Sequence, residues 1–344
     1  MSAPNYPAAA TTDGRPAAEC NSVGAVIDIG SNSVKLLVGQ VRGTTVERIY
    51  SIGESIKLGQ GAFQTRRLQP NVIERVAGTV AEFVQAASKF SPAVLRILAT
   101  SAVREAINRA DFVRVVEARA QKRVAILSGE EEAELLFEGV RREPGLAGSP
   151  LMVVDIGGGS TQVIVSESGA GELYYSFPFG SLRLLETLGL SGVLSQADLA
   201  KCRLATAIFV QHQMIPAIGR TGFEIGAFDG MRLIGTGRKL RKLASAPLPN
   251  QADWAGEPPS LTAKRLTFII EQLWGMSRTE RAARLAIAEA NVDVALAGAI
   301  TLEAILQRFG FELLHTSDGN LRKGAILKWF GESQNSVATN WRMA

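Results

Sequence analysis

The sequence predicts a two-domain α/β protein, and three observations support this fold class. The chain has 344 residues, and because a domain usually contains about 100–200 residues, two domains are expected. Short apolar strands alternate with amphipathic helices over most of the length, as in α/β folds. A strand–turn–strand pattern also occurs twice, in Ala25–Val38 and in Leu151–Val165, which indicates an internal duplication.

The second of these hairpins, LMVVDIGGGSTQVIV, has the features of a phosphate-binding turn. Its first strand ends at Asp155, and the turn that follows contains Gly157, Gly158, Gly159, Ser160 and Thr161. Because glycine has no Cβ, successive backbone N–H groups can approach a phosphate and form an anion-binding nest. A carboxylate beside a phosphate requires a divalent cation between them, so Asp155 is a candidate metal ligand.

The first hairpin, AVIDIGSNSVKLLV, repeats this arrangement. Asp28 corresponds to Asp155, and the glycine turn corresponds to Gly30, Ser31, Asn32 and Ser33. Two such hairpins, about one domain apart, therefore predict a phosphate held between two copies of the same unit.

Composition limits the class of protein. Hydrophobic residues make up 46% of the chain, enough for a sizeable core, and no apolar run approaches the ~20 residues that span a bilayer. Residues 1–22 lack a basic start followed by an apolar stretch, so a disordered tail is expected there rather than a secretion signal. The two cysteines, Cys20 and Cys202, provide no disulfide framework, and we expect a soluble protein of the cytoplasm.

The net charge of +4 is modest but unevenly distributed. Between Lys201 and Asn250 there are eight Lys or Arg residues and two acids, Glu224 and Asp229. This basic segment is either an ordinary solvated face or a surface for a polyanionic partner. Aromatic residues do not alternate with these cations as they do on surfaces that stack on bases, so nucleic acid is not the expected partner.

The first half of the chain predicts a mixed sheet with covering helices. Three strands are expected within Val23–Tyr50, further strands over Val94–Ala99 and Val124–Leu127, and helices over Pro70–Ala87, Ala102–Asn108 and Asp111–Lys122. Helices and short connections separate the later strands, which favours parallel pairing. The short helix places Arg104 near the carboxyl end of a strand.

Three glutamates follow the last of these strands, in the segment Ser128–Ala133. If Ser128 is the N-cap of a helix, Glu131 completes a capping box and Glu130 interacts favourably with the helix dipole. Glu132 has no such structural role and lies at a strand-to-helix junction, where ligands often bind. Glu132 is therefore a candidate general base, although a solvated glutamate in a first helical turn is the commoner case.

The second half is expected to begin after the Gly/Pro loop Pro144–Pro150. After the second hairpin, we expect strands at Tyr174–Phe179, Arg232–Ile234 and Phe311–His315, a loop at Pro247–Pro259, and helices at Leu182–Leu188, Gln196–Gln213, Leu261–Trp274, Arg278–Glu289, Asp293–Phe309 and Asn320–Phe330. The glycine turn Gly235–Gly237 precedes Arg238 and Lys239, and this combination either holds phosphates or is an exposed basic turn.

Other nucleotide and metal motifs are missing from the sequence. It contains neither a Walker-type loop nor a Gly-x-Gly-x-x-Gly turn after a strand. His212 and His315 are far apart and have no Cys partners, so a zinc site is not expected and both are interpreted as structural residues.

Four motifs, in order, resemble the exopolyphosphatase/guanosine pentaphosphate phosphohydrolase family. They are Asp28–Ser33 (DIGSNS), Ala99–Glu105 (ATSAVRE), Ser128–Ala133 (SGEEEA) and Asp155–Thr161 (DIGGGST). Further similar stretches are Phe179–Leu184, Ala297–Ala299 and Ser317–Gly324, so the resemblance covers about Val23–Phe330.

This resemblance implies the duplicated fold of actin, sugar kinases and the 70-kDa heat-shock chaperones, in which two ribonuclease-H-like domains enclose a cleft. The first domain would comprise residues 23–140 and 318–331 and the second residues 141–317, because the last helix is expected to return to the first domain. Residues 1–22 and 332–344 would be tails.

The resemblance also implies that water hydrolyses a terminal phosphoanhydride, with Glu132 as general base and with Asp28 and Asp155 holding Mg²⁺. Arg104 would neutralise phosphate charge, and Lys35 and the two turns would bind phosphates. Positioning and charge stabilisation supply most of the catalysis in such a phosphoryl transfer.

Departures from the family pattern fall within this expected site. Gln162 replaces a glutamate, which removes one anionic ligand. Lys35 replaces an arginine and so lacks a bidentate fork, and Lys323 replaces a glutamate. Gly237–Lys239 replaces a more glycine-rich turn. The changes toward positive charge suit a long or highly charged substrate chain.

Three functions therefore stay open. The leading hypothesis is a bacterial, Mg²⁺-dependent exopolyphosphatase that acts on inorganic polyphosphate. The second is hydrolysis of guanosine pentaphosphate, a nucleotide of the stringent response, although no stretch identifies a guanine pocket. The third is a non-catalytic sensor of polyphosphate or nucleotide whose site changed at Gln162. We expect a monomer or homodimer with neither a membrane nor a nucleic-acid partner.

Overall fold

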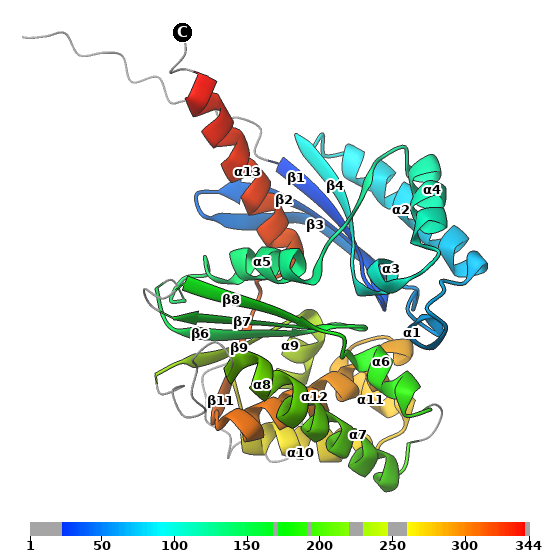
Figure 1. Ribbon diagram of the computed structural model, residues 1–344, viewed down its shortest axis with the longest axis vertical. Helices are drawn as coiled ribbons and strands as arrows, with labels where there is room; N and C mark the ends of the chain where they lie inside the picture. Colours follow the sequence, from blue (N-terminus) through cyan, green and yellow to red (C-terminus); the bar gives the residue numbers. More distant parts are fainter. Residues whose placement is uncertain are drawn as a thin grey trace, which may run out of the picture.

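The structure is a computed structural model that describes residues 23–146, 148–167, 171–190, 194–219, 230–246 and 260–340. This part of the chain forms two β-sheets with helices on both faces of each sheet (Figure 1). Cys20, the expected N-terminal tail and the expected loop Pro247–Pro259 lie outside the described residues.

The first sheet has five strands in the order β3-β2-β1-β4-β5. They are β1 (Val23–Ile29), β2 (Ser33–Arg42), β3 (Thr45–Ser55), β4 (Val94–Ala99) and β5 (Val124–Ile126). The first three pair antiparallel, whereas β4 pairs parallel with both β1 and β5. The predicted meander followed by parallel strands is confirmed.

The second sheet has six strands in the order β10-β11-β9-β6-β7-β8. They are β6 (Leu151–Ile156), β7 (Thr161–Glu167), β8 (Gly171–Phe177), β9 (Arg232–Thr236), β10 (Ser260–Thr262) and β11 (Leu313–Ser317). β6, β7 and β8 pair antiparallel, β9 pairs parallel with β6 and β11, and β10 pairs antiparallel with β11. The run β8-β7-β6-β9-β11 thus repeats the order and directions of β3-β2-β1-β4-β5, which confirms the internal duplication.

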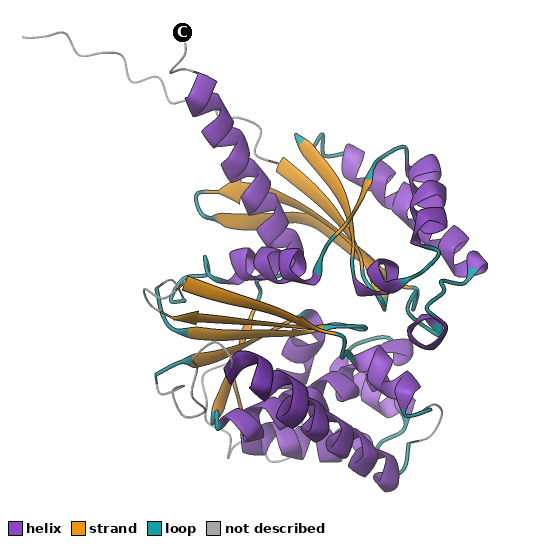
Figure 2. Ribbon diagram, viewed as in Figure 1, coloured by secondary structure: helices purple, strands orange, loops and turns teal. Residues whose placement is uncertain are grey.

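The helices form two outer layers and one shared inner layer (Figure 2). The outer face of the first sheet is covered by α2 (Pro70–Ser88) and α4 (Arg109–Ala120). The outer face of the second sheet is covered by α7 (Gln196–Phe209), α10 (Ala263–Trp274) and α12 (Val292–Phe309). The inner layer contains α5 (Gly129–Val140) and α13 (Leu321–Asn340). Shorter helices are α1 (Ala62–Thr65), α3 (Ser101–Glu105), α6 (Ser181–Thr187), the π-helix η1 (Val210–Met214), α8 (Ile215–Gly219), α9 (Arg238–Ala244), α11 (Arg278–Leu285) and the 3₁₀ helix η3 (Glu289–Asn291).

Helix α5 joins the two halves because it buries apolar side chains on both sides. Leu135 packs in a cluster with strands of the first sheet and with α13, whereas Leu136 and Phe137 pack against strands of the second sheet. The predicted capping box starts this helix, since Ser128 Oγ accepts a hydrogen bond from the Glu131 N–H at 3.1 Å and the Glu131 carboxylate accepts one from the Ser128 N–H at 2.7 Å.

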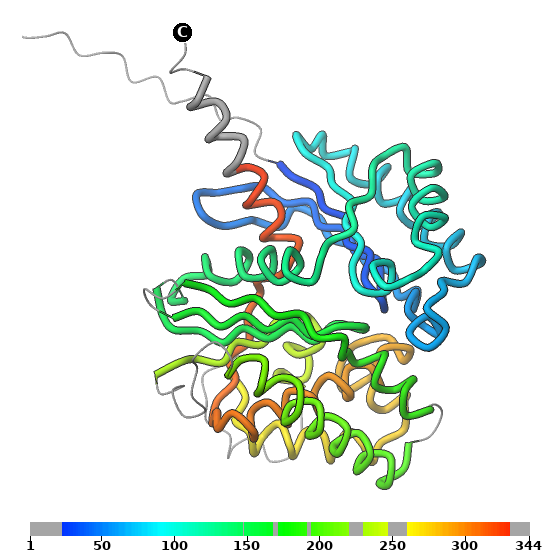
Figure 3. The backbone as a smooth tube through the Cα atoms, viewed as in Figure 1, coloured from blue at the N-terminus to red at the C-terminus, as the bar shows by residue number. Residues whose placement is uncertain are grey.

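Helix α13 returns from the second half of the chain to the first sheet, where it lies beside the N-terminal strands (Figure 3). Its crossing with α5 is a backbone contact made possible by glycines. A Cβ placed on Gly324 would lie 1.7 Å from the carbonyl oxygen of Leu135, and one placed on Gly139 would lie 2.4 Å from that of Asn320. The domain boundaries expected from the resemblance stay a prediction.

Several element bounds need correction, including that of the helix expected over Arg278–Glu289, which ends at Leu285. Leu261 belongs to strand β10, and the helix begins at Ala263, because pairing with β11 decides the state of a short apolar run whose periodicity is ambiguous. The last strand begins at Leu313 rather than Phe311. The helix from Gln196 continues through the π-helix to Gly219. Residues 332–340, expected to be part of a tail, are helical, because apolar periodicity marks the packed part of a helix and not its end.

Within the described ranges, no helix is by itself long and apolar enough to cross a membrane. The segments Arg278–Leu285 and Glu289–Phe309 meet the length and composition criteria only when joined across a bend of 94°.

We predict that Gly324→Ala destabilises the protein by at least about 2–3 kcal/mol, because the added methyl group overlaps the backbone of α5 and forces the helices apart. Gly298→Ala is a matched control within α12, since its Cβ would lie no closer than 3.9 Å to another residue, at Ile156. That control is expected to be neutral or to stabilise the fold by up to about 1 kcal/mol. Urea unfolding measures both free energies, and equal stabilities would contradict the backbone contact.

Candidate active site

A cleft of about 720 Å³ lies between the two halves of the molecule. Both hairpin turns line it, together with the start of α5, the start of α9 and the start of α13. Strands β1 and β6 both end at this cleft, so the duplication brings two equivalent strand ends to one place. Ligands of open α/β sheets commonly bind at such strand ends.

The two hairpin turns have the same hydrogen-bonded form. The N–H of Gly30 donates to the carbonyl of Ser33 at 3.1 Å, and the N–H of Gly157 donates to that of Ser160 at 2.9 Å. This equivalence supports the correspondence between the turns that the sequence predicts.

The carbonyls of the second turn face the start of α6. Those of Gly157 and Gly158 accept hydrogen bonds from backbone N–H groups of α6, and that of Gly159 accepts one from Arg183 Nε at 2.8 Å. In a trans peptide the next N–H points opposite to the carbonyl, so three successive N–H groups, on residues 158–160, point away from α6. Such a series can bind an anion.

The carbonyls of the first turn are arranged in a similar way. Ser31 O accepts the N–H of Gly59 at 2.8 Å, and Asn32 O accepts the N–H groups of Ile56 and Lys57. The N–H groups of Asn32 and Ser33 therefore point away from that segment.

The two turns also touch each other, which gives the glycines a second role. A Cβ on Gly158 would lie 3.2 Å from the backbone nitrogen of Asn32, and one on Gly159 would lie 2.4 Å from Ser101 Oγ and 2.6 Å from Ser31 Oγ. Ser31 Oγ and Ser101 Oγ form a hydrogen bond of 2.8 Å. The glycines are thus needed for the approach of the two halves as well as for access to the backbone.

Asp28 and Asp155, the predicted metal ligands, both line the cleft. Burial raises the pKa of Asp28, Asp155 raises it further, and Lys35 and Arg322 oppose this. Asp155 Oδ1 accepts a hydrogen bond of 2.5 Å from Thr236 Oγ1, a contact that the sequence did not reveal.

Glu132 is 9% exposed and also lines the cleft. Arg104 Nη1 donates to Glu132 Oε2 at 3.0 Å and to the carbonyl of Leu127 at 2.8 Å, so Arg104 fixes the carboxylate against the end of β5. Burial raises the pKa of Glu132 to about 7 in spite of Arg104, and Asp28 and Asp155 also raise it. The solvated glutamate considered as an alternative is therefore excluded.

Cations surround these carboxylates. Burial lowers the pKa of Lys239 to about 7, and Lys35 lowers it further, whereas Asp155 opposes this. Lys35 is open to the cleft, but the enclosing protein and Arg322 lower its pKa. The sequence gives Arg322 no individual role, and its signal is its place in the stretch Ser317–Gly324.

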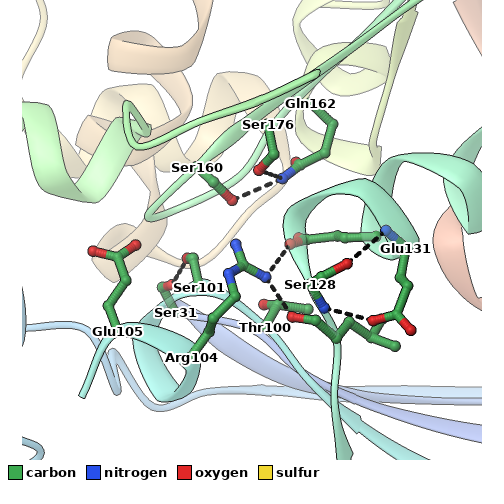
Figure 4. A network of polar contacts seen from close by, with 12 residues as sticks. Ser31, Thr100, Ser101, Arg104, Glu105, Ser128, Glu131, Ser160, Gln162 and Ser176 are labelled. Atoms are coloured by element: carbon green, nitrogen blue, oxygen red, sulfur yellow. Dashed lines mark hydrogen bonds and ion pairs between the residues drawn. The ribbon is translucent and has the colours of Figure 1, made fainter. Parts of the chain in front are cut away.

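Three predicted residues take other positions. Thr161 does not face the cleft: it is fully buried and donates to the carbonyl of Phe179 at 2.5 Å, because its strand position directs it into the protein. Arg104 contacts Glu132, and its predicted role on phosphate stays a prediction. Gln162 is 1% exposed and donates to Ser160 Oγ at 2.9 Å and to Ser176 Oγ at 3.2 Å (Figure 4).

Most of the remaining predicted residues line the cleft, and their roles in binding phosphate stay predictions. Those that line the cleft are Gly30, Ser31, Asn32, Ser33, Lys35, Gly157, Gly158, Gly159, Ser160, Arg238 and Lys239. Of the two histidines, His212 is exposed in η1 and His315 lies on β11, as expected for structural residues.

An ion pair fastens the two halves beside the turns. Arg183 Nη2 donates to both carboxylate oxygens of Glu105, at 2.6 and 2.8 Å. The guanidinium carbon of Arg183 also lies 4.1 Å from the ring centroid of Phe63. Since Arg183 holds the carbonyl of Gly159 as well, this one side chain connects α6 with α3, α1 and the second turn.

The donor set of the cleft fits Mg²⁺. In the part of the chain that the structure describes, no group of three or more His, Cys, Asp or Glu side chains could enclose a metal ion. Mg²⁺, however, is usually bound by one or two carboxylates, with waters and substrate phosphates completing its octahedral shell. Asp28 and Asp155, which face one cleft and interact electrostatically, provide such a pair.

Comparisons with known proteins show relatives along most of the chain. The model of the Ppx/GppA phosphatase family matches residues 25–333. The chain is 29% identical to Exopolyphosphatase 2 of Mycobacterium tuberculosis, over 89% of this chain and 98% of that protein. It is also 26% identical to a guanosine-5'-triphosphate,3'-diphosphate pyrophosphatase of Aeromonas salmonicida, over 91% of this chain but only 60% of that longer protein.

Solved structures show the same fold. An exopolyphosphatase from Cytophaga hutchinsonii superposes with a TM-score of 0.75 at 21% identity, covering 88% of this chain and 96% of that one. The Aquifex aeolicus member of the Ppx/GppA family gives a TM-score of 0.67 at 22% identity, covering 90% of this chain and 98% of that one. These matches and the two duplicated sheets confirm the predicted actin-like fold class.

We predict a coupling free energy of about 1 kcal/mol between Glu105 and Arg183, because the bidentate pair is partly shielded from solvent. A double-mutant cycle with Glu105→Gln and Arg183→Gln, measured by urea unfolding, gives this value. The pair Arg42–Glu47, with both side chains 60% exposed, is the control and should couple by less than about 0.5 kcal/mol. Equal coupling in the two cycles would show that Glu105 and Arg183 form only a surface contact.

Proposed function

The chain belongs to the Ppx/GppA phosphatase family, and we propose on this basis that it is an exopolyphosphatase that hydrolyses the terminal phosphoanhydride of inorganic polyphosphate. The observation that carries this proposal is the cleft itself, where Glu132 faces two backbone turns and a set of cations. The named relatives, which include exopolyphosphatases, support the same reaction class.

Substrate binding would use the groups shared between the two halves. The N–H groups of both turns would bind oxygens of the terminal phosphates, and Lys35, Arg322 and Lys239 would balance their charge. Binding would in turn raise the lowered pKa values of Lys35 and Lys239 by supplying nearby negative charge. The transferred group would thus be held by donors from both sides.

Glu132 would act as the general base. Its Oε2 accepts the hydrogen bond from Arg104, which leaves Oε1 to take a proton from the attacking water. Its pKa of about 7 suits this task, because a base is most effective when its pKa is close to the working pH. Arg104 would favour the ionised form of the carboxylate and would orient it.

Asp28 and Asp155 would hold Mg²⁺, which would neutralise charge on the phosphate oxygens. Ion binding would also relieve the repulsion between these two carboxylates, which contributes to the raised pKa of Asp28.

Guanosine pentaphosphate is the alternative substrate, as the Aeromonas relative's name indicates for that protein. The non-catalytic sensor is the third possibility. The presence of Glu132, with its Arg104 partner, favours catalysis over it. A cytoplasmic location and a monomeric or homodimeric state stay predictions from the sequence.

We expect the purified protein to release orthophosphate from polyphosphate faster than from guanosine pentaphosphate, and to lose activity when EDTA removes Mg²⁺. Glu132→Gln should lower kcat by about 10²–10⁴-fold, because the amide cannot accept the proton. Glu131→Gln is the control, since Glu131 caps α5 and does not line the cleft. Tight binding without turnover in the wild type would favour the sensor, and a preference for the nucleotide would favour the alternative substrate.

We further expect kcat/KM to rise with pH through about 7, because Glu132 must lose its proton to act as a base. Arg104 lowers the pKa of Glu132, so Arg104→Gln should move this acid limb to higher pH by about one unit. Arg114→Gln, a change at an exposed residue of α4, should leave the profile in place. The pH dependence of initial rates measures the shift, and an unchanged limb in Arg104→Gln would exclude Glu132 as the titrating group.

A further inference from the structure

A second group of cations lines the cleft and extends away from Lys35 and Lys239. Arg48 comes from β3, Arg238 and Arg241 come from α9, and Lys323 comes from α13. They interact with one another, since Arg48 lowers the pKa of both Arg241 and Lys323. Three elements that are far apart in sequence thus bring four positive charges to one region.

Acids compensate only part of this charge. Asp318 forms an ion pair with Arg241, and Glu143 faces Arg241 and Lys323 and raises the pKa of each. Burial and the other cations outweigh Glu143, because the pKa values of Arg241 and Lys323 are both lowered overall. The four cations and these two acids leave a net charge of about +2, which an anion would neutralise.

A side pocket of about 440 Å³ adjoins this region. Arg241 and Lys323 line both the cleft and the pocket. Two hydrogen-bonding atoms of the pocket, Arg241 Nε and Thr316 Oγ1, are buried without a partner, and so is Glu143 Oε1. Both the N–H of Arg241 and the hydroxyl of Thr316 can donate to phosphate oxygens, and a buried donor left unpaired costs free energy.

Helix α9 connects this region with the catalytic carboxylates. Arg238 and Arg241 are three residues apart and lie on one face of the helix, separated by about 4.5 Å along its axis. Lys239 interacts with Lys35, Asp155 and Arg238. A continuous series of cations therefore runs from the carboxylates along α9 to Lys323.

We propose that Arg48, Arg241 and Lys323, with the adjoining side pocket, form a distal subsite for the phosphates of the substrate chain that follow those held at the catalytic carboxylates. This inference rests on the proposed function and extends it, because it makes the enzyme selective for chains long enough to reach the subsite. Short chains occupy the catalytic end alone and gain nothing from these cations.

The test compares long-chain polyphosphate with tripolyphosphate in the double variant Arg48→Gln/Lys323→Gln. These two residues are chosen because Arg241 keeps its ion pair with Asp318. We expect KM for the long chain to rise about tenfold or more, with kcat unchanged, and both constants for tripolyphosphate to stay within about twofold. The control is Lys242→Gln, which removes a cation of α9 that does not line the cleft. It should change kcat and KM for neither substrate.

If the double variant raises KM equally for both substrates, or for neither, the proposed distal subsite is wrong. A binding measurement distinguishes failure of the distal subsite from failure of the proposed function. Binding of the same two polyphosphates is measured by calorimetry in Glu132→Gln, with and without the two distal substitutions. If the wild type releases no phosphate, the proposed reaction fails, yet a preference for the long chain that the distal substitutions remove still supports the subsite. Equal affinities for both chains would exclude it.

Discussion

The site depends on a steric constraint, the backbone contact between two turns that lie in different halves of the chain. Gly158 and Gly159 lie so close to Asn32, Ser31 and Ser101 that a Cβ at either position would meet these residues at 2.4–3.2 Å. Only this approach brings the N–H groups of both turns to one cleft. Arg183 supports the contact, because it holds the Gly159 carbonyl and bridges to Glu105. The chemistry of the cleft thus depends on the two hairpin turns in contact, and neither turn provides it alone.

The fold could be predicted to a large extent, because its signals are local. The two hairpins, the capping box at Ser128 and the parallel strands after the meander follow from glycine turns, cap residues and apolar periodicity. The predictions were wrong where a segment distant in the sequence decides the secondary structure or the direction of a residue. Leu261 is a strand residue because β11 lies beside it, and Thr161 points inward because the carbonyl of Phe179 accepts its hydroxyl. No pattern within a short window contains that information.

The site was predicted in part for the same reason. The carboxylates and turns belong to compact motifs, and the structure brings Asp28, Asp155 and Glu132 to one cleft. Thr236, Arg322 and Arg183 lie far away in sequence from the groups they affect, and each acts through one contact or charge that only the folded chain creates. Their residue types are common on any surface, so the sequence indicates no individual role for them, although Arg183 and Arg322 lie in stretches that resemble the family.

The charges around Glu132 explain why the neutral residue at position 162 is compatible with the site. Gln162 pairs across the strands with Asp155, whereas the equivalent partner of Asp28 is Lys35. A carboxylate at 162 would add another buried negative charge beside Asp155, and this charge would further raise the pKa of Glu132, which Asp155 already raises. A bound polyanion would act in the same direction, so the base stays ionised only if cations offset both effects. Gln162 holds Ser160 without adding that charge, which leaves Arg104 to maintain an ionised base.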